Sequence, residues 1–111
     1  MINLYVDNTR PKPEGFILAK TAEEAIKIID SENIEILSLD HDLGTNRRGQ
    51  LLPTGYDLVK YICEYWDELN ISKIYIHSSN PIGRENMYRY LLSALRANKI
   101  YGVEVFPYKY K

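Results

Sequence analysis

Apolar residues in this chain fall into short runs that alternate with longer stretches of helical spacing. Runs of mostly apolar residues predict strands at 2–6, 16–19, 34–39, 73–78 and 102–106. A capping-box pattern, TAEE, begins a helical stretch at 21–30. Apolar residues recur at helical spacing after Thr54, for about four turns, and again after Asn80. The chain is therefore predicted to alternate strands with helices.

The connection after the first predicted strand differs from the later ones. Residues 9–15 (TRPKPEG) contain prolines and a glycine, which favour a loop over a helix. The other connections are long enough to join parallel strands through a helix. We therefore expect a three-layer α/β fold, a parallel sheet with flanking helices in which a Pro-rich loop replaces the first crossover helix. No repeat or linker interrupts the pattern, so residues 1–111 are predicted to form a single domain.

Composition changes this picture little. With 111 residues, 45% of them hydrophobic and 26% charged, the chain has the composition of an ordinary globular domain. A net charge of -1 argues against a surface that coats nucleic acid, although a local basic patch could still hold a phosphate. The sequence has no signal-like N-terminus and no membrane-length apolar window, so we expect a cytoplasmic protein without membrane contact. The oligomeric state is left open.

Cys63 is the single cysteine of the chain. A single cysteine excludes an internal disulfide and a cysteine-based metal cluster within one chain. Because Cys63 falls on the apolar side of a predicted helix, we expect it in the core.

Polar side chains follow three of the predicted strands. Their sequences are Asp7-Asn8, Asp40-His41-Asp42 and His77-Ser78-Ser79-Asn80. In open parallel sheets, ligands bind beyond the carboxyl ends of the strands, so these residues predict one site at one edge. The chain's two histidines both lie in these clusters, and such a pair can supply an acid and a base near neutral pH. Turn formation and helix capping are alternative roles for the single aspartates.

The stretch NPIGREN favours an anion site at the start of the last helix. Backbone amides around Asn80 and Gly83, together with the charge of Arg84, are donors that can hold a phosphate. Arg10, in the loop after the first strand, could reach the same edge. A simple Pro-Gly turn and a solvated loop arginine are the alternatives.

Neighbouring residues of a regular strand point to opposite faces, which constrains the predicted site. Asp40 and His41 cannot both point inward while the strand stays extended, and the same holds for His77 and Ser78. The side chains can converge only where the chain leaves strand geometry. Histidines on opposite faces would argue against a mechanism that uses both.

With these residues in view, the chain resembles the receiver domains of two-component response regulators. The resemblance is closest to a divergent branch of receiver-like domains that process cyclic phosphates. It is carried by the stretches LYVDNTRPKPEG, LSLDHDLG, TGYDLVKYI and HSSNPIGREN. The resemblance implies a receiver-like, flavodoxin-like fold. It also implies that Asp40 corresponds to the phosphate-accepting aspartate, Asp7 to an acid that holds magnesium, and Ser78 to the switch hydroxyl.

The chain departs from ordinary receivers at three points. Asn8 stands where a second acid usually follows Asp7, which removes a charge from a magnesium site. Phe106 precedes Pro107 where receivers have a lysine, and Lys109 lies two residues beyond the expected place. The third departure is the pair of histidines, which the divergent branch is thought to use on cyclic phosphates.

The resemblance implies a phosphoesterase, a hydrolase of RNA repair, that acts on a 2′,3′-cyclic phosphate of a nucleotide or an RNA end. The expected acid and base are His41 and His77, beside Asp40 and Asp42. The residues expected to bind the phosphate are Arg84, Ser78, Asn80, Gly83 and Arg10.

Two other functions stay open. The first is a non-catalytic or atypical receiver module for signalling, which binds a protein partner or is phosphorylated on Asp40. The second is a metal-dependent phosphoesterase in which Asp7, Asp40 and Asp42, with one histidine, hold Mg²⁺ or another divalent cation.

Overall fold

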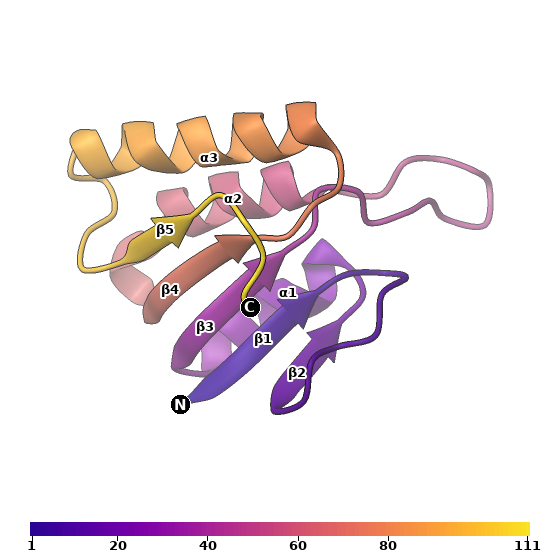
Figure 1. Cartoon of the computed structure of the whole chain (residues 1–111), viewed down its shortest axis with the longest axis horizontal. Coiled ribbons are helices and arrows are strands. Elements are labelled where there is room, and N and C mark those ends of the chain that lie inside the picture. The colour runs from indigo at the N-terminus through magenta and orange to yellow at the C-terminus, as the bar shows by residue number, and fades with distance from the viewer.

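Five parallel strands form one sheet in the order β2-β1-β3-β4-β5 in the computed structural model, which describes residues 1–111 (Figure 1). The strands are β1 (Ile2–Val6), β2 (Phe16–Ala19), β3 (Ile34–Leu39), β4 (Ile71–Ile76) and β5 (Glu104–Phe106). The helices are α1 (Ala22–Ser31), α2 (Gly55–Glu64) and α3 (Pro81–Arg96), with a 3₁₀ helix η1 (Trp66–Glu68). The predicted α/β fold with a parallel sheet is confirmed.

All three helices cover the same face of the sheet (Figure 1). The crossovers that contain α1, α2 and α3 all run in one direction along the sheet, and right-handed crossovers in one direction place their helices on one face. Only the connection from β1 to β2 runs the other way, and residues 7–15 form it without a helix. The Pro-rich loop in place of the first crossover helix is thus confirmed, while the expected flanking helices lie on one face only.

The main core lies between this helical layer and the sheet. Alternate strand residues such as Leu4, Leu37 and Ile74 are fully buried there against the helices. Cys63 of α2 is buried in the same cluster, as predicted. No helix of the structure is long and apolar enough to cross a membrane.

The opposite face of the sheet is covered by an aromatic C-terminal segment, residues 107–111. Figure 1 shows this segment crossing the strands on the side away from the helices. The ring of Tyr110 lies 5.5 Å from that of Phe16 and 5.2 Å from that of Tyr75, measured between centroids. Tyr75 in turn stacks on Phe106 at 4.4 Å. These aromatic contacts take the place of a second helical layer.

Several element boundaries differ from those predicted, and β5 begins at Glu104 rather than at residue 102. The helix that begins after Thr54 ends at Glu64 rather than running four turns, and η1 follows it. The chain must reverse within a few residues to enter β4 at Ile71, and a 3₁₀ turn is tighter than an α-helix. Strand β4 ends at Ile76, so His77 and Ser78 lie just beyond it.

Candidate functional site

Hydrogen bonds between neighbouring strands continue one residue past the ends of β1, β3 and β4. The amide of Asp40 donates to the carbonyl of Val6 at 3.0 Å, and that of His77 to the carbonyl of Leu39 at 2.9 Å. Because side chains alternate along an extended chain, Asp7, Asp40 and His77 point toward the aromatic face, away from the helices. At the carboxyl ends of the strands, the predicted site residues therefore form two groups, one on each face of the sheet.

The first group is a buried network of Asp7, His77 and Ser38. The Nε2 atom of His77 lies 3.0 Å from Oδ2 of Asp7, and its Nδ1 atom lies 2.6 Å from Oγ of Ser38. The imidazole also stacks on the ring of Tyr5, with centroids 4.2 Å apart and planes 4° from parallel. The side chain of His77 is only 2% exposed, so both ring nitrogens are engaged by the protein itself.

Asp7 is held in its charged form by hydrogen bonds. Burial alone raises the pKa of this carboxyl, but hydrogen bonds from the backbone amides of Arg10 and Thr9 and from His77 outweigh burial and lower the pKa. The two amides donate to Oδ1 at 3.0 and 2.9 Å. Arg10 also donates from Nη1 to the carbonyl of His77 at 2.7 Å, so this guanidinium helps to hold His77 in place.

Burial determines the charge of His77. Desolvation lowers the pKa of His77, and the nearby carboxylates of Asp7 and Asp40 offset this effect only in part. A neutral ring beside a charged Asp7 carries its proton on Nε2, which donates to the carboxylate, while Nδ1 accepts from the hydroxyl of Ser38. In this arrangement His77 has no free nitrogen for a substrate.

The second group centres on His41, which lies on the helical side of the sheet edge. Its Nδ1 atom lies 2.9 Å from Oδ1 of Asp42, and the two side chains are 19% and 63% exposed. Its ring packs on Gly83 so closely that a Cβ added there would lie 2.5 Å from Cγ of the ring. No buried side-chain nitrogen or oxygen of the protein lacks a partner, so the unpaired Nε2 of His41 is open to solvent.

The two histidines thus lie on opposite sides of the sheet edge. Asp40, the residue before His41 in the chain, accepts a hydrogen bond from the amide of His41 at 2.8 Å and is 9% exposed. Neighbouring residues Asp40 and His41 keep opposite directions because hydrogen bonding to the next strand holds the chain extended at Asp40. This geometry does not favour a mechanism in which both histidines contact one substrate.

The residues predicted to hold a divalent cation do not fit that role as arranged. Both oxygens of Asp7 already accept hydrogen bonds, and its side chain has no exposed surface. Asp42 is paired with His41 at the opposite side of the edge. No three histidine, cysteine or acidic side chains converge in this structure, and Oδ1 of Asp40 already accepts a hydrogen bond from the amide of His41.

The predicted anion residues come together at the start of α3. Asn80 caps the helix by accepting from the amide of Gly83 at 3.0 Å, and Ser78 accepts from the amide of Asn80 at 3.1 Å. Arg84 donates from Nη1 to the carbonyl of Ser78 at 2.9 Å. Because the cap already uses the Gly83 amide, Arg84 is the main donor that remains for an anion.

A pocket of about 370 Å³ lies between this helix start and the C-terminal segment. His77, Ser78 and Arg84 line it together with Tyr108 and Lys109. Sequence reasoning missed these last two residues. The signal that could have found them is the same edge rule, because they follow the carboxyl end of β5. A lysine is therefore present at this edge, although it lies two residues beyond its usual place in receivers.

Arg10 does not join the residues at the start of α3. Its guanidinium is directed to the carbonyl of His77, and it is absent from the pocket lining. Among the predicted phosphate-binding residues, Ser78, Asn80, Gly83 and Arg84 are brought together, and Arg10 belongs to the buried network.

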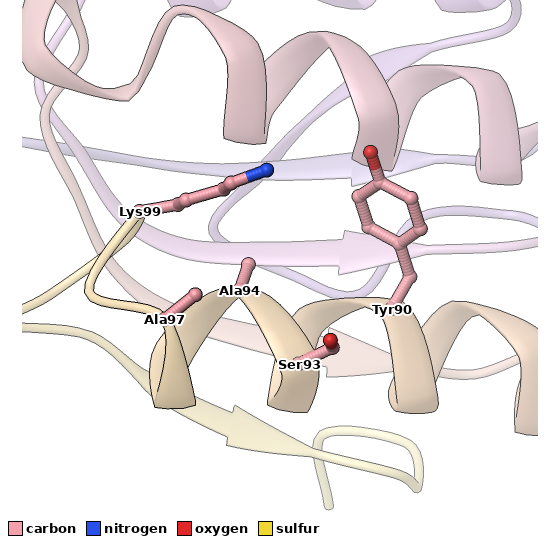
Figure 2. A pocket seen from close by; sticks show the side chains of 5 residues that line it. All are labelled: Tyr90, Ser93, Ala94, Ala97 and Lys99. Carbon is pink, nitrogen blue, oxygen red and sulfur yellow. The ribbon is translucent and has the colours of Figure 1, made fainter.

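A second pocket, of about 150 Å³, lies at the far end of α3 between Tyr90 and Lys99 (Figure 2). Figure 2 shows both side chains reaching from the same side of α3 and the turn that follows it. Burial raises the pKa of the nearby Cys63 thiol to about 11, so this cysteine is not a nucleophile at neutral pH. None of the predicted site residues lines this pocket.

Comparison with known proteins agrees with the fold. A search among curated proteins found no matching relative. The family described as "Cyclic-phosphate processing Receiver domain" matches residues 2–93, which include the polar ends of β1, β3 and β4 but not Tyr108 and Lys109 after β5. The receiver-like fold is therefore confirmed, and the chain belongs to the family of cyclic-phosphate processing receiver domains.

Proposed function

We propose that the protein is a phosphoesterase that binds a 2′,3′-cyclic phosphate at the start of α3 and opens it with water. The observation that carries this proposal is the position of His41. Its imidazole, in a side chain that is 19% exposed, is oriented by Asp42 and packs on Gly83, the residue next to Arg84. A proton carrier thus lies beside a positive charge at a helix start, within a family named for cyclic-phosphate processing.

His41 acts as the general base. Nδ1–H of His41 donates a hydrogen bond to the carboxylate of Asp42, which leaves the lone pair of Nε2 free to take a proton from water. The water oxygen then bonds to phosphorus, and the bond from phosphorus to one ribose oxygen breaks. That oxygen takes a proton from solvent, so the product is a phosphate monoester with a free neighbouring hydroxyl.

Arg84 stabilises the negative charge that grows on the phosphoryl oxygens during ring opening. Its hydrogen bond to the carbonyl of Ser78 fixes the guanidinium before the ligand arrives, so little reorganisation is needed. The N-terminal end of the α3 dipole adds to the same effect. Asn80 and Ser78 hold this helix start in shape rather than donating to the phosphate.

His77 has a positioning role in this proposal. Its hydrogen bonds to Asp7 and Ser38 tie the ends of β1, β3 and β4 together beneath the edge. This departs from the two-histidine mechanism that the sequence favoured, because His77 has no free ring nitrogen. Cyclic ends of this kind form when a 2′-hydroxyl of RNA attacks its neighbouring phosphate, so the proposed setting is the repair of RNA ends.

The test is turnover of adenosine 2′,3′-cyclic phosphate and of an oligoribonucleotide with the same terminus. We expect His41→Ala to lower kcat by roughly 10²–10⁴-fold, the range for loss of a general base. Arg84→Ala should also lower turnover, whereas Arg89→Ala, an exposed arginine paired with Glu85 on the same helix, serves as the matched control. A chelator should leave the rate unchanged, because Asp7 is not free to hold a cation.

Full activity of His41→Ala would overturn the assignment of the base. Loss of turnover on chelation would favour the metal-dependent alternative. Absence of turnover with either substrate, together with labelling of Asp40 by an acyl-phosphate donor, would instead support the signalling module.

A further inference from the structure

We propose that Tyr108 and Lys109 form a nucleoside-binding part of this site, so that the ligand is a nucleotide or RNA end rather than any cyclic phosphate. The inference rests on the proposed function for the identity of the phosphate group. It adds a stacking surface for the base and a second cation, both contributed by the segment after β5.

The pocket between α3 and the C-terminal segment has the charge expected of an anion site. Arg84 and Lys109 both line it, and no acidic residue takes part in its lining. His41 lies outside this pocket, so Arg84 is the residue through which the pocket joins the proposed phosphate site. Neither cation belongs to a salt bridge, since the ion pairs of the protein involve His41, His77 and Arg89. Two positive charges in a pocket without an acidic lining residue favour a bound anion there.

Tyr108 provides an aromatic surface at the mouth of the same pocket. Its ring contacts Tyr75 at a centroid distance of 6.2 Å with planes at 62°, and Phe106 at 5.7 Å with planes at 47°. These rings belong to the aromatic face of the sheet and hold Tyr108 in place. The residue is nevertheless 57% exposed, so a ring held by its neighbours is left open to solvent.

An exposed aromatic ring that is fixed by its neighbours and lies beside positive charge can bind nucleotides whatever their base. Every base can stack on such a ring, while the cations hold the phosphate. Tyr108 and Lys109 are adjacent in the chain and line one pocket, so a single nucleotide can engage both. A small cyclic phosphate without a base would use only the cations.

The experiment compares two ligands at equilibrium by calorimetry: adenosine 2′,3′-cyclic phosphate and glycerol 1,2-cyclic phosphate, which lacks a base. Binding is measured in the His41→Ala background, so that neither ligand is consumed. We expect Tyr108→Ala to weaken nucleotide binding roughly tenfold and to leave the glycerol ligand unaffected, whereas Tyr108→Phe keeps both affinities. Lys109→Ala should weaken the binding of both ligands, and the loss of affinity should be smaller at high salt.

The matched controls are Tyr101→Ala and Lys111→Ala. Tyr101 is 55% exposed but precedes β5 at the other end of the strands, and Lys111 is an exposed lysine outside the pocket. Neither control should change either affinity. Equal effects of Tyr108→Ala on both ligands, or no effect on either, would overturn the inference.

Failure of this inference can be told apart from failure of the proposed function. A protein that binds the nucleotide in the expected pattern but never hydrolyses it contradicts only the proposed function. Hydrolysis by the wild type with unchanged affinities in Tyr108→Ala and Lys109→Ala contradicts only the inference.

Discussion

The imidazole of His77 donates to the carboxylate of Asp7 across 70 positions of sequence, at 3.0 Å. The two residues follow β4 and β1, and β3 lies between these strands in the sheet. The contact is possible because Ser38, the residue of β3 aligned with Tyr5 and Tyr75, is small enough to leave room for the ring. One hydrogen-bonded side chain thus links three strands beneath the candidate site.

This network predicts that acid destabilises the protein. The pKa of His77 lies below its ordinary value of 6.5 in the folded state, so below about that pH the unfolded chain binds more protons than the folded one. Stability is therefore lost as pH falls through this range, with a slope of at most about 1.4 kcal/mol per pH unit for one group. Asp7, whose pKa lies below 3.8, adds a further loss at more acidic pH.

Urea unfolding at a series of pH values from 7.5 to about 4.5 measures this dependence. His77→Gln should flatten the profile over this range, because glutamine does not titrate. His41→Gln, the control, should leave the slope in place. A slope that persists in His77→Gln would show that another group causes the acid sensitivity.

Ser38→Ala should destabilise the protein by about 1–3 kcal/mol. The substitution leaves Nδ1 of His77 without a partner in a buried position, and an unsatisfied buried polar atom carries that cost. Thermal unfolding of the variant beside Ser93→Ala, an exposed serine of α3, checks the effect. Equal stability of Ser38→Ala and wild type would mean that water or a rearranged ring replaces the lost bond.

The close approach of the His41 ring explains why a glycine stands at position 83. In a helix, alanine is normally more stable than glycine by about 1 kcal/mol. Here a Cβ would lie 2.5 Å from the imidazole, so Gly83→Ala should displace the ring, reduce turnover and fail to stabilise the protein. His41→Ala removes the ring but keeps the Cβ of residue 41, which would lie 3.0 Å from the added Cβ, so Gly83→Ala should be less unfavourable in this background than in the wild type.

A double-mutant cycle of stabilities measures this coupling between Gly83 and His41. The free energies of unfolding should be non-additive, with Gly83→Ala less unfavourable when the imidazole is absent. Additive effects would mean that the ring moves aside without cost, and the close packing of His41 would then not position it for catalysis.

Tyr110 should stabilise the face of the sheet that has no helices. Its ring packs against Phe16 and Tyr75, and removing it exposes both. We expect Tyr110→Ala to cost about 1–3 kcal/mol, whereas Tyr110→Phe should be nearly neutral because the ring is kept. Chemical denaturation with Lys111→Ala as the control tests this. If Tyr110→Ala were neutral, the segment would contribute nothing to covering this face.

The sequence by itself determined the elements and the edge at which polar residues gather. Apolar periodicity is a local property, so the strands and helices followed from it, and the prolines and glycine of residues 9–15 predicted a loop as the first connection. Parallel strands also place their carboxyl ends together, which brought Asp7, Asp40 and His77 to one edge. The resemblance to cyclic-phosphate processing receivers, carried by four short stretches, was likewise visible before the structure was known and is confirmed by the family match.

Only the tertiary structure decided which side of that edge each residue takes and what it contacts. Alternation along an extended chain depends on where hydrogen bonding between strands stops, and this separated His41 from His77. The partners of His77 and the pocket position of Lys109 are long-range relationships without a local pattern. A sequence can mark residues able to carry protons or bind anions, but burial and neighbours decide which of them can reach a substrate.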